Sequence, residues 1–388
     1  MKTAIWLYLF IFVAFFDLHA QFPILTPFAI SLGAAPSFIG LIMGIYSITH
    51  IPGNLLAGYG VDRFGSKPFM VISLIFAGIL LLFQSNVSNP WTLLIIRSIS
   101  GFVLAFLSPA SLSLLAKIAK NRIQQGHLMS GNGIVHTLAS VVSPAAGALL
   151  VAKIGFTACF TFLGWALIIT GIFAIFGVKE KETLIAVSSL QHSEAMAGNK
   201  PDSSVQGSTP WLFFGIPLAI SCAQGILFFE LPLMKEARNS ILTSGILFSL
   251  VSFGALITLS LFFLNRYSPY MRTIVGSFAL ALTFFGMAIG WPLSLTISLL
   301  MIGMAKGIIF PSMATLLASM TREDRYGRIF SLLSISFSIG AFLGPVLAGQ
   351  LRDYISPYYI AFLALMIALT LLSPGKILPQ VTSGKDMA

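Results

Sequence analysis

The chain alternates long apolar runs with short polar segments along almost its whole length. Twelve of the runs are long enough to cross a membrane as helices, because a spanning helix needs about 20 mainly apolar residues. The predicted spans are residues 4–28, 36–60, 68–88, 90–118, 127–153, 155–178, 211–234, 239–264, 270–291, 292–319, 325–352 and 356–373. The boundaries 153/155 and 291/292 are the least defined, since those runs are nearly continuous. The pattern predicts an all-α membrane protein with twelve transmembrane helices.

Composition and charge agree with a membrane protein. Of the 388 residues, 57% are hydrophobic and 9% are charged, whereas soluble domains carry about 25% charged residues. The net charge of +10 does not indicate a nucleic-acid partner, because the basic residues lie between apolar runs rather than in a stripe with stacking aromatic residues. Of the 22 Lys and Arg residues, two lie within spans, four lie in outer loops and the other sixteen lie in inner segments if the N-terminus is inside. This bias predicts a multi-pass protein of the cell membrane with both termini in the cytoplasm.

The two halves of the chain resemble each other at a nearly constant offset. Pro144 recurs as Pro345, Asp62-Arg63 as Asn265-Arg266, and Phe22-Pro23-Ile24-Leu25 as Leu231-Pro232-Leu233-Met234. We therefore expect two six-helix pseudo-repeats, residues 1–178 and 211–388, joined by a flexible cytoplasmic linker at 179–210 that is rich in Ser, Gly and charge. The first apolar run could also be read as a signal peptide, but its removal would leave eleven spans and break this repeat.

A charged turn joins the second and third predicted spans, with the sequence Gly-Tyr-Gly-Val-Asp-Arg-Phe-Gly-Ser-Lys-Pro at residues 58–68. It resembles G-x-x-x-D-R-x-G-x-[KR], the cytoplasmic signature of the major facilitator superfamily, and the matching residues are Gly58, Asp62, Arg63, Gly65 and Lys67. The resemblance implies the fold of that family and a gating role for the turn. It also implies that Asp62 faces the start of the eleventh helix, near Tyr326 and Gly327, where the helix dipole favours a carboxylate.

Further motifs are similar to the twelve-helix drug/proton antiporters within that family. Arg97 and Gly101 fit the helix-4 signature R-x-x-x-G. The helix-5 signature of exporters, G-x-x-x-G-P-x-x-G-G, keeps Pro144 and Gly147 here but has Ala139, Ser143 and Ala148 in place of glycines, which weakens the inference of export. Helix 11 carries a fuller version with Gly340, Gly344 and Pro345. Small residues at this spacing predict close helix packing, and the prolines predict kinks.

Asp17 and Glu230 are the only acidic residues inside the predicted spans. Ionisable residues within a membrane mark functional sites by default, and loss of water makes a carboxyl group easier to protonate. Arg97 is the natural partner of Asp17, and the resemblance also places a helix-1 acid near the helix-4 arginine. Asp17, Arg97 and Glu230 are therefore predicted to couple transport to protons. A purely structural ion pair remains open for Asp17, and an interfacial or gating role for Glu230.

Other polar side chains inside the spans are candidates for lining a central cavity. They are Gln21, which shares a helix face with Asp17, and His50, Asn54, His136 and Lys306. Lys306 lies near the middle of its span, where it could attract an anionic substrate group or neutralise Glu230. We expect His19 to face a neighbouring helix in a structural role. No set of residues has the spacing of a metal site.

The sequence therefore predicts a proton-coupled secondary transporter that exports small amphipathic molecules by alternating access. A carrier that imports or flips a specific metabolite or lipid is the alternative within transport. A membrane-embedded enzyme is the alternative from another class, and it would need a nucleophile and base or metal ligands at one depth, which the spans do not offer. ATP is not expected as the energy source, because there is no Walker loop. We expect no cofactor, a small-molecule substrate, protons and the lipid bilayer as partners, and a monomer.

Overall fold

The computed structural model describes residues 2–118, 122–177, 211–235, 240–319 and 326–371. These segments are helical, and they contain no β-strand. The first half consists of α1 (Lys2–Ala20), α2 (Phe22–Ser31), α3 (Pro36–Phe64), α4 (Ser66–Gln84), α5 (Pro90–Leu104), α6 (Leu107–Ile118) and α7 (Arg122–Gly177). The second half consists of η1 (Trp211–Phe214), α9 (Gly215–Glu230), η2 (Leu231–Leu233), α11 (Ile241–Leu259), η3 (Phe262–Arg266), α12 (Pro269–Ala288), α13 (Leu295–Ser319), α14 (Tyr326–Leu351) and α15 (Pro357–Leu371).

The described helices are consistent with the predicted twelve spans. Nine of them are long and apolar enough to cross a membrane, and α1 with α2 forms a tenth span that is bent by 44°. The long helix α7 contains two predicted spans, which meet at Gly155 with φ of 80°. The remaining span is α15, which is apolar but has only 15 residues. The predicted linker at 179–210 lies outside the described residues.

Prolines interrupt two spans that the sequence pattern had joined. Proline lacks an N–H and its ring clashes with the carbonyl four residues earlier, so Pro23 disturbs the helix at His19 and Pro109 disturbs it at Ala105. The helix accordingly breaks at Gln21, between α1 and α2, and at residues 105–106, between α5 and α6. In the second half α9 ends at Glu230 and the short 3-10 helix η2 follows, at the corresponding proline. The predicted spans 4–28 and 90–118 agree with these helices in extent; the first is bent by 44° at its break, whereas residues 90–115 form one apolar span.

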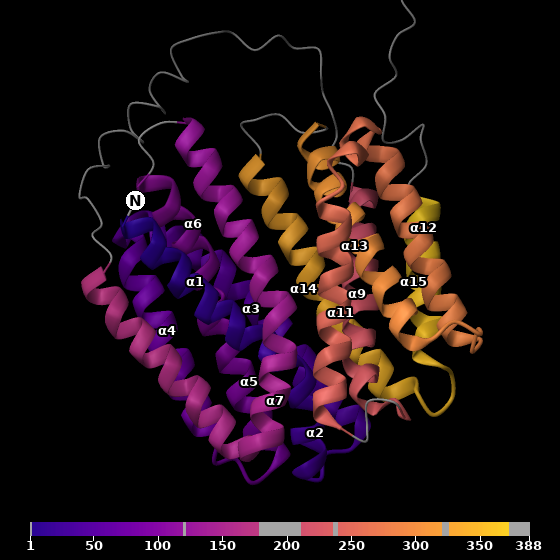
Figure 1. Cartoon of the computed structure of the whole chain (residues 1–388), viewed down its shortest axis with the longest axis horizontal. Helices are drawn as coiled ribbons and strands as arrows, with labels where there is room; N and C mark the ends of the chain where they lie inside the picture. The colour runs from indigo at the N-terminus through magenta and orange to yellow at the C-terminus, as the bar shows by residue number, and fades with distance from the viewer. Residues whose placement is uncertain (1, 119–121, 178–210, 236–239, 320–325, 372–388) are drawn as a thin grey trace, which may run out of the picture.

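The two halves lie side by side, with the indigo and magenta helices in one and the orange and yellow helices in the other (Figure 1). They meet where α3 packs on α14 and where α7 packs on α11. At the first contact, a methyl group added to Gly40 would overlap the carbonyl oxygen of Pro345. At the second, a methyl group on Gly245 would lie 2.5 Å from the carbonyl oxygen of Pro144. The same proline–glycine contact thus occurs on both sides of the interface, as two pseudo-repeats require.

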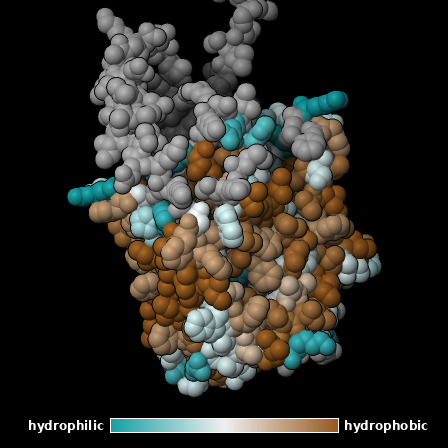
Figure 2. All heavy atoms as spheres, turned by 60° about the vertical axis from the view of Figure 1, so that its left-hand side comes forward, coloured by the Kyte–Doolittle hydropathy of each residue, from teal (hydrophilic) through white to brown (hydrophobic). Residues whose placement is uncertain are grey.

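The outer surface of the bundle is mainly apolar. Figure 2 shows a broad brown face with the hydrophilic residues gathered near its two ends. Large apolar side chains are strongly exposed there, including Phe176 at 76%, Ile134 at 68% and Trp91 at 66%. An apolar surface of this size would be unfavourable in water and is suited to lipid. The chain is therefore a multi-pass membrane protein.

Candidate functional site: a charged link beside a cavity between the halves

Asp17 and Arg97 are joined by one amide side chain. The Nε2 atom of Gln21 donates hydrogen bonds to both carboxylate oxygens of Asp17 at 3.0 Å. Nη1 of Arg97 donates to Oε1 of the same Gln21 at 2.9 Å. The three side chains are 2–5% exposed. An acid and a guanidinium are thus held in the apolar interior with Gln21 between them, and we call these three residues the charged link.

The bend of the first span places Gln21 between the two charges. Asp17 and Gln21 are four residues apart, so their side chains lie over each other on one helix face. The helix then breaks at Gln21, whose carbonyl accepts the N–H groups of Ile24 and Leu25 at the start of α2. The sequence pointed to Arg97 as the partner of Asp17. In the structure the two charges interact electrostatically, but each makes its hydrogen bond to Gln21.

Tyr46 of α3 completes the surroundings of Arg97. The guanidinium carbon lies 4.7 Å from the centre of the Tyr46 ring, at a distance typical of cation–π contacts. The Nε atom of Arg97 is buried and has no hydrogen-bond partner among the described residues. Arg97 therefore has capacity for one more acceptor.

A cavity of about 170 Å³ lies between the halves and is bordered by Gln21 and Arg97 of the charged link. Its walls are Leu18, Gln21, Phe22, Leu25, Met43, Tyr46, Ser47 and Arg97 from the first half, and Ser221, Gln224, Gly225, Phe228, Ala341 and Pro345 from the second. The sequence analysis missed Tyr46, Ser221 and Gln224. Tyr46 had a signal, because it lies four residues before His50 on the same helix face.

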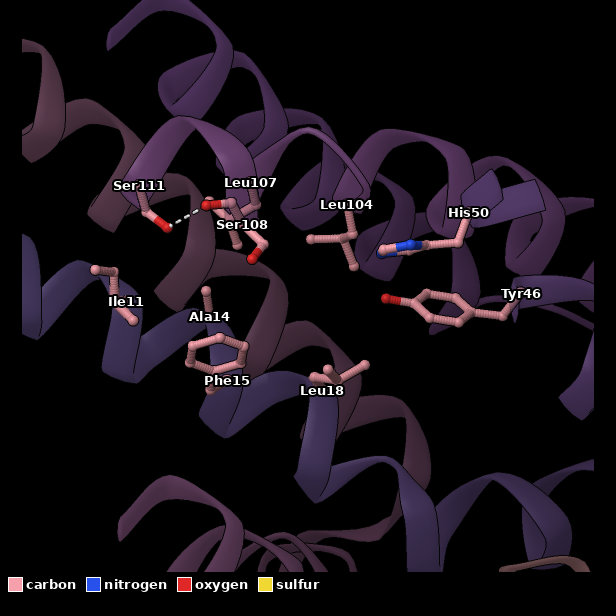
Figure 3. Close-up of a pocket in the computed structure, with 10 residues that line it drawn as sticks. All are labelled: Ile11, Ala14, Phe15, Leu18, Tyr46, His50, Leu104, Leu107, Ser108 and Ser111. Carbon is pink, nitrogen blue, oxygen red and sulfur yellow. Dashed lines mark hydrogen bonds between the residues drawn. The ribbon is translucent and has the colours of Figure 1, made fainter. Parts of the chain in front are cut away.

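A second cavity of about 230 Å³ is formed within the first half, and it shares Leu18 and Tyr46 with the cavity between the halves. Figure 3 shows His50 and Tyr46 pointing into it from α3, with Leu107, Ser108 and Ser111 across from them. The predicted cavity residue His50 does line this space. It accepts a hydrogen bond on Nδ1 from Nδ2 of Asn54 at 2.8 Å.

Asn54 reaches across the interface between the halves. Its Nδ2 lies 3.5 Å from Oγ of Ser334 on α14, so the His50–Asn54 pair is tied to the second half by a long hydrogen bond. Asn54 lies on a narrow groove with Ser334 and Ser338 rather than on either of the two larger cavities.

Glu230 has a different environment from Asp17. Its Oε2 lies 3.7 Å from Nη2 of Arg352, while its Oε1 is buried without a hydrogen-bond partner among the described residues. Glu230 is at the end of α9 and Arg352 follows α14, which is the predicted outer side. The structure thus gives Glu230 the partner Arg352 and not Lys306.

Lys306 and two histidines meet between the halves. The ammonium of Lys306 lies 5.9 Å from the ring centre of Phe228 and 5.8 Å from that of Phe310. The imidazoles of His19 and His136 are 5.3 Å apart and edge-on to each other, and Lys306 acts electrostatically on both. His19 faces α7, a neighbouring helix, as expected.

The charged turn between α3 and α4 is built around Gly65. Gly65 has φ of 88° and separates the two helices without a loop, a conformation that a residue with a side chain rarely adopts. Arg63 donates from Nη1 to the hydroxyl of Tyr59 at 2.8 Å. The side chains of Asp62 and Tyr326 and the contacts of Gly58 and Gly327 lie outside the described part of the structure, so the latch stays a prediction. Lys67 is half-buried at the start of α4.

The glycines of the two packing motifs lie at close helix contacts. A methyl group on Gly147 would lie 2.7 Å from Cβ of Ala20, where α7 crosses α1. One on Gly340 would overlap the carbonyl oxygen of Leu218, and one on Gly344 that of Cys222, where α14 crosses α9. Pro144 and Pro345 remain inside continuous helices. Within the described part of the chain, no group of three His, Cys, Asp or Glu residues could hold a metal ion.

Comparison with known proteins gives consistent similarities. A sequence model of the Major Facilitator Superfamily matches residues 7–297 and 277–379. The multi-drug resistance efflux pump PmrA homolog of Lactococcus lactis subsp. lactis is 22% identical over 344 residues, which are 86% of this chain and 84% of that protein. The multidrug resistance protein MdtG of Escherichia coli K12 is 24% identical over 320 residues, which are 79% of this chain and 76% of that protein.

The fold also matches a solved structure. A bacterial homolog of the human lysosomal transporter Spinster, crystallised in an inward-facing and occupied conformation, superposes with a TM-score of 0.74. The match covers 95% of each chain at 14% sequence identity. At this identity the likeness concerns the fold alone.

Proposed function

Since this chain belongs to the Major Facilitator Superfamily, we propose that it is a proton-coupled transporter that exports small amphipathic molecules across the cell membrane. One relative is named as a multi-drug resistance efflux pump and another as a multidrug resistance protein, and this supports export as the direction and amphipathic molecules as the substrates. Family membership indicates a transporter rather than an enzyme.

The charged link is the observation that carries the proposal. A buried carboxylate is costly unless it is paired, and here the amide of Gln21 and the charge of Arg97 both favour the charged form of Asp17. When Asp17 takes up a proton, Gln21 loses a charged acceptor and its hold on Arg97 weakens. Arg97 lines the cavity between the halves and can then turn to a substrate group. Protonation of Asp17 would thereby change the affinity of Arg97 for a substrate group, and this linkage couples the two binding events.

The coupling needs a conformational change that opens the link to each side in turn. In this family's fold, the two halves rock about a central site. We propose that the paired contacts of α3 with α14 and of α7 with α11 are the pivots of this motion. Asp62, in the turn between α3 and α4, would help to close the cytoplasmic side, with both termini on that side.

The test uses the purified full-length protein in vesicles with an imposed pH gradient, screened across amphipathic dyes and metabolites. Asp17→Asn keeps the size of the side chain and removes its charge, so it should abolish uphill transport while substrate still binds. Undiminished uphill transport by Asp17→Asn would refute proton coupling through this residue.

A carrier for a specific metabolite or lipid is the second candidate, and the interior cation Lys306 favours it. Such a carrier would move its substrate down the gradient of that substrate, with or without a pH difference. The same vesicles distinguish the two, because an exporter coupled to protons accumulates substrate only while the pH gradient lasts.

A further inference from the structure

We propose that Lys306, His19 and His136 form the site for an acidic group of the substrate, so that the transported molecules are organic anions with an apolar body. This inference rests on the proposed transport function and narrows its substrate class. The three residues come from α13, α1 and α7. The imidazoles of His19 and His136 are 5.3 Å apart, and His19 and Lys306 lie against the two rings of the Phe22–Phe228 pair.

Lys306 is an interior cation that lacks an anionic partner. Within the described part of the chain it has no carboxylate or hydrogen-bond acceptor, and its contacts are the faces of Phe228 and Phe310. Cation–π contacts are weak compared with the cost of holding an unpaired charge away from water. The two rings therefore offset only part of the cost of burying the Lys306 ammonium. An anion that binds beside it would offset the remainder.

The protein's own interior acids are not free to act as that anion. Asp17 accepts both its hydrogen bonds from Gln21, and Glu230 is paired with Arg352 near the predicted outer side. These two are the only acids within the spans. No acid in the described part of the chain therefore pairs with Lys306, and we infer that its partner is a bound ligand.

The two imidazoles add hydrogen-bonding groups beside this charge. Nδ1 of His19 lies 2.8 Å from the carbonyl oxygen of Phe15, and since a carbonyl only accepts, this nitrogen is the donor. Nε2 of His19 is left for another partner. A protonated ligand group or a water molecule can bind there while the ammonium neutralises the charge.

The position of His136 indicates open space at the cluster. Ile134 and Leu138 are 68% and 53% exposed and form the lipid-facing side of α7. His136 lies two residues from each, about 200° around the helix, yet it is also exposed. That face is turned toward α1, because the ring of His136 packs edge-on against those of Phe15 and His19, so the exposed surface of His136 lies on the interior side of α7.

An apolar wall adjoins the cluster. The ring of His19 packs on Phe22 at 5.4 Å, Phe22 on Phe228 at 4.4 Å, and Phe228 on Phe248 at 5.2 Å. Phe22 and Phe228 also line the cavity between the halves. A molecule with its acidic group at Lys306 would therefore lay its apolar part along these rings, which fits an amphipathic anion better than an inorganic one.

The experiment measures binding of three probes with one apolar body to the purified full-length protein by calorimetry. The probes are 1-naphthaleneacetic acid, 1-naphthaleneacetamide and 2-(1-naphthyl)ethylamine, which are anionic, neutral and cationic. Wild type should bind the acid at least about tenfold more tightly than the amide, a preference of a size expected for one charged contact. Lys306→Met should remove this preference and leave amide binding unchanged, and Lys306→Arg should retain it.

Three results would overturn the proposal: equal binding of acid and amide by wild type, tighter binding of the amine, or no binding of the acid at about 1 mM. The comparison of probes on wild type needs no variant, so it holds even if Lys306→Met fails to fold. Vesicles with a pH gradient then distinguish the two proposals. Gradient-driven transport without a preference for anions would support the proposed pump and refute the anion site. Acid binding that depends on Lys306, without gradient-driven transport, would support the anion site and refute the proposed pump.

Discussion

Replacement of Gln21 by leucine tests the charged link most directly. Leu has nearly the volume of Gln but cannot donate to Asp17 or accept from Arg97. The change therefore removes the contacts at 3.0 Å and 2.9 Å without opening a large cavity. It leaves a carboxylate and a guanidinium in the apolar interior, each short of a partner.

The expected cost follows from these two contacts. Hydrogen bonds to charged groups contribute about 1.5–3 kcal/mol in soluble proteins. Interhelical hydrogen bonds in membranes average only about 0.6 kcal/mol, because the groups find other partners in the unfolded state. Because Gln21 contacts a charged group at both ends, we expect its loss to cost more than this membrane average. Gln21→Leu should lower the free energy of unfolding by about 2–3 kcal/mol.

Gln84 offers a matched control for the same substitution. Gln84 is 1% exposed, against 4% for Gln21, but its Nε2 has no hydrogen-bond partner among the described residues. Gln84→Leu removes an unsatisfied donor and should leave the stability unchanged or raise it. The assay is unfolding of the purified protein in mixed detergent micelles, followed by circular dichroism. If Gln21→Leu proves as stable as Gln84→Leu, then the link does not hold the first span to α5, and the reasoning is wrong.

Three further predictions concern other parts of the interface and the link. Gly40→Ala should cost about 1–3 kcal/mol of thermal stability and slow transport, because its methyl group overlaps the Pro345 carbonyl, while Gly133→Ala, which meets no atom within 4 Å, should behave like wild type. In a double-mutant cycle on transport rate, Asp17→Asn and Arg97→Ala should combine less than additively, since they share one interaction; additive logarithms of rate would mean that they act separately. Asp62→Asn should slow turnover more than it weakens binding and should speed labelling of cysteines on the cytoplasmic side, and unchanged labelling with unchanged turnover would mean that the turn only anchors the helices.

The architecture was predictable from the sequence because lipid imposes a simple rule on it. Each span must be apolar and about 20 residues long, so the runs of apolar residues gave most helix ends to within a few residues. The pairing of Pro144 with Pro345 also indicated the repeat, and the structure places both at equivalent contacts. Bends were harder to place, because Pro23 breaks its helix at Gln21 whereas Pro144 and Pro345 lie in continuous helices.

The sequence identified most of the residues of the site, but it did not show which of them contact each other. The scarcity of charge in the spans singled out Asp17, Arg97, Glu230 and Lys306. Which of them meet depends on rotations of the helices that the hydropathy pattern does not fix. Gln21 therefore appeared in the sequence as a cavity residue, and only the bend at its own position reveals that it lies between the two charges.

The charged link also bears on the order in which the protein is made. Its three members lie within the first 97 residues, and they belong to helices that enter the membrane before any part of the second half exists. The interior acid and its guanidinium can therefore find each other during synthesis, before the second half enters the membrane. Lys306 enters the membrane about 200 residues later than Arg97, with the first half already in place to receive it.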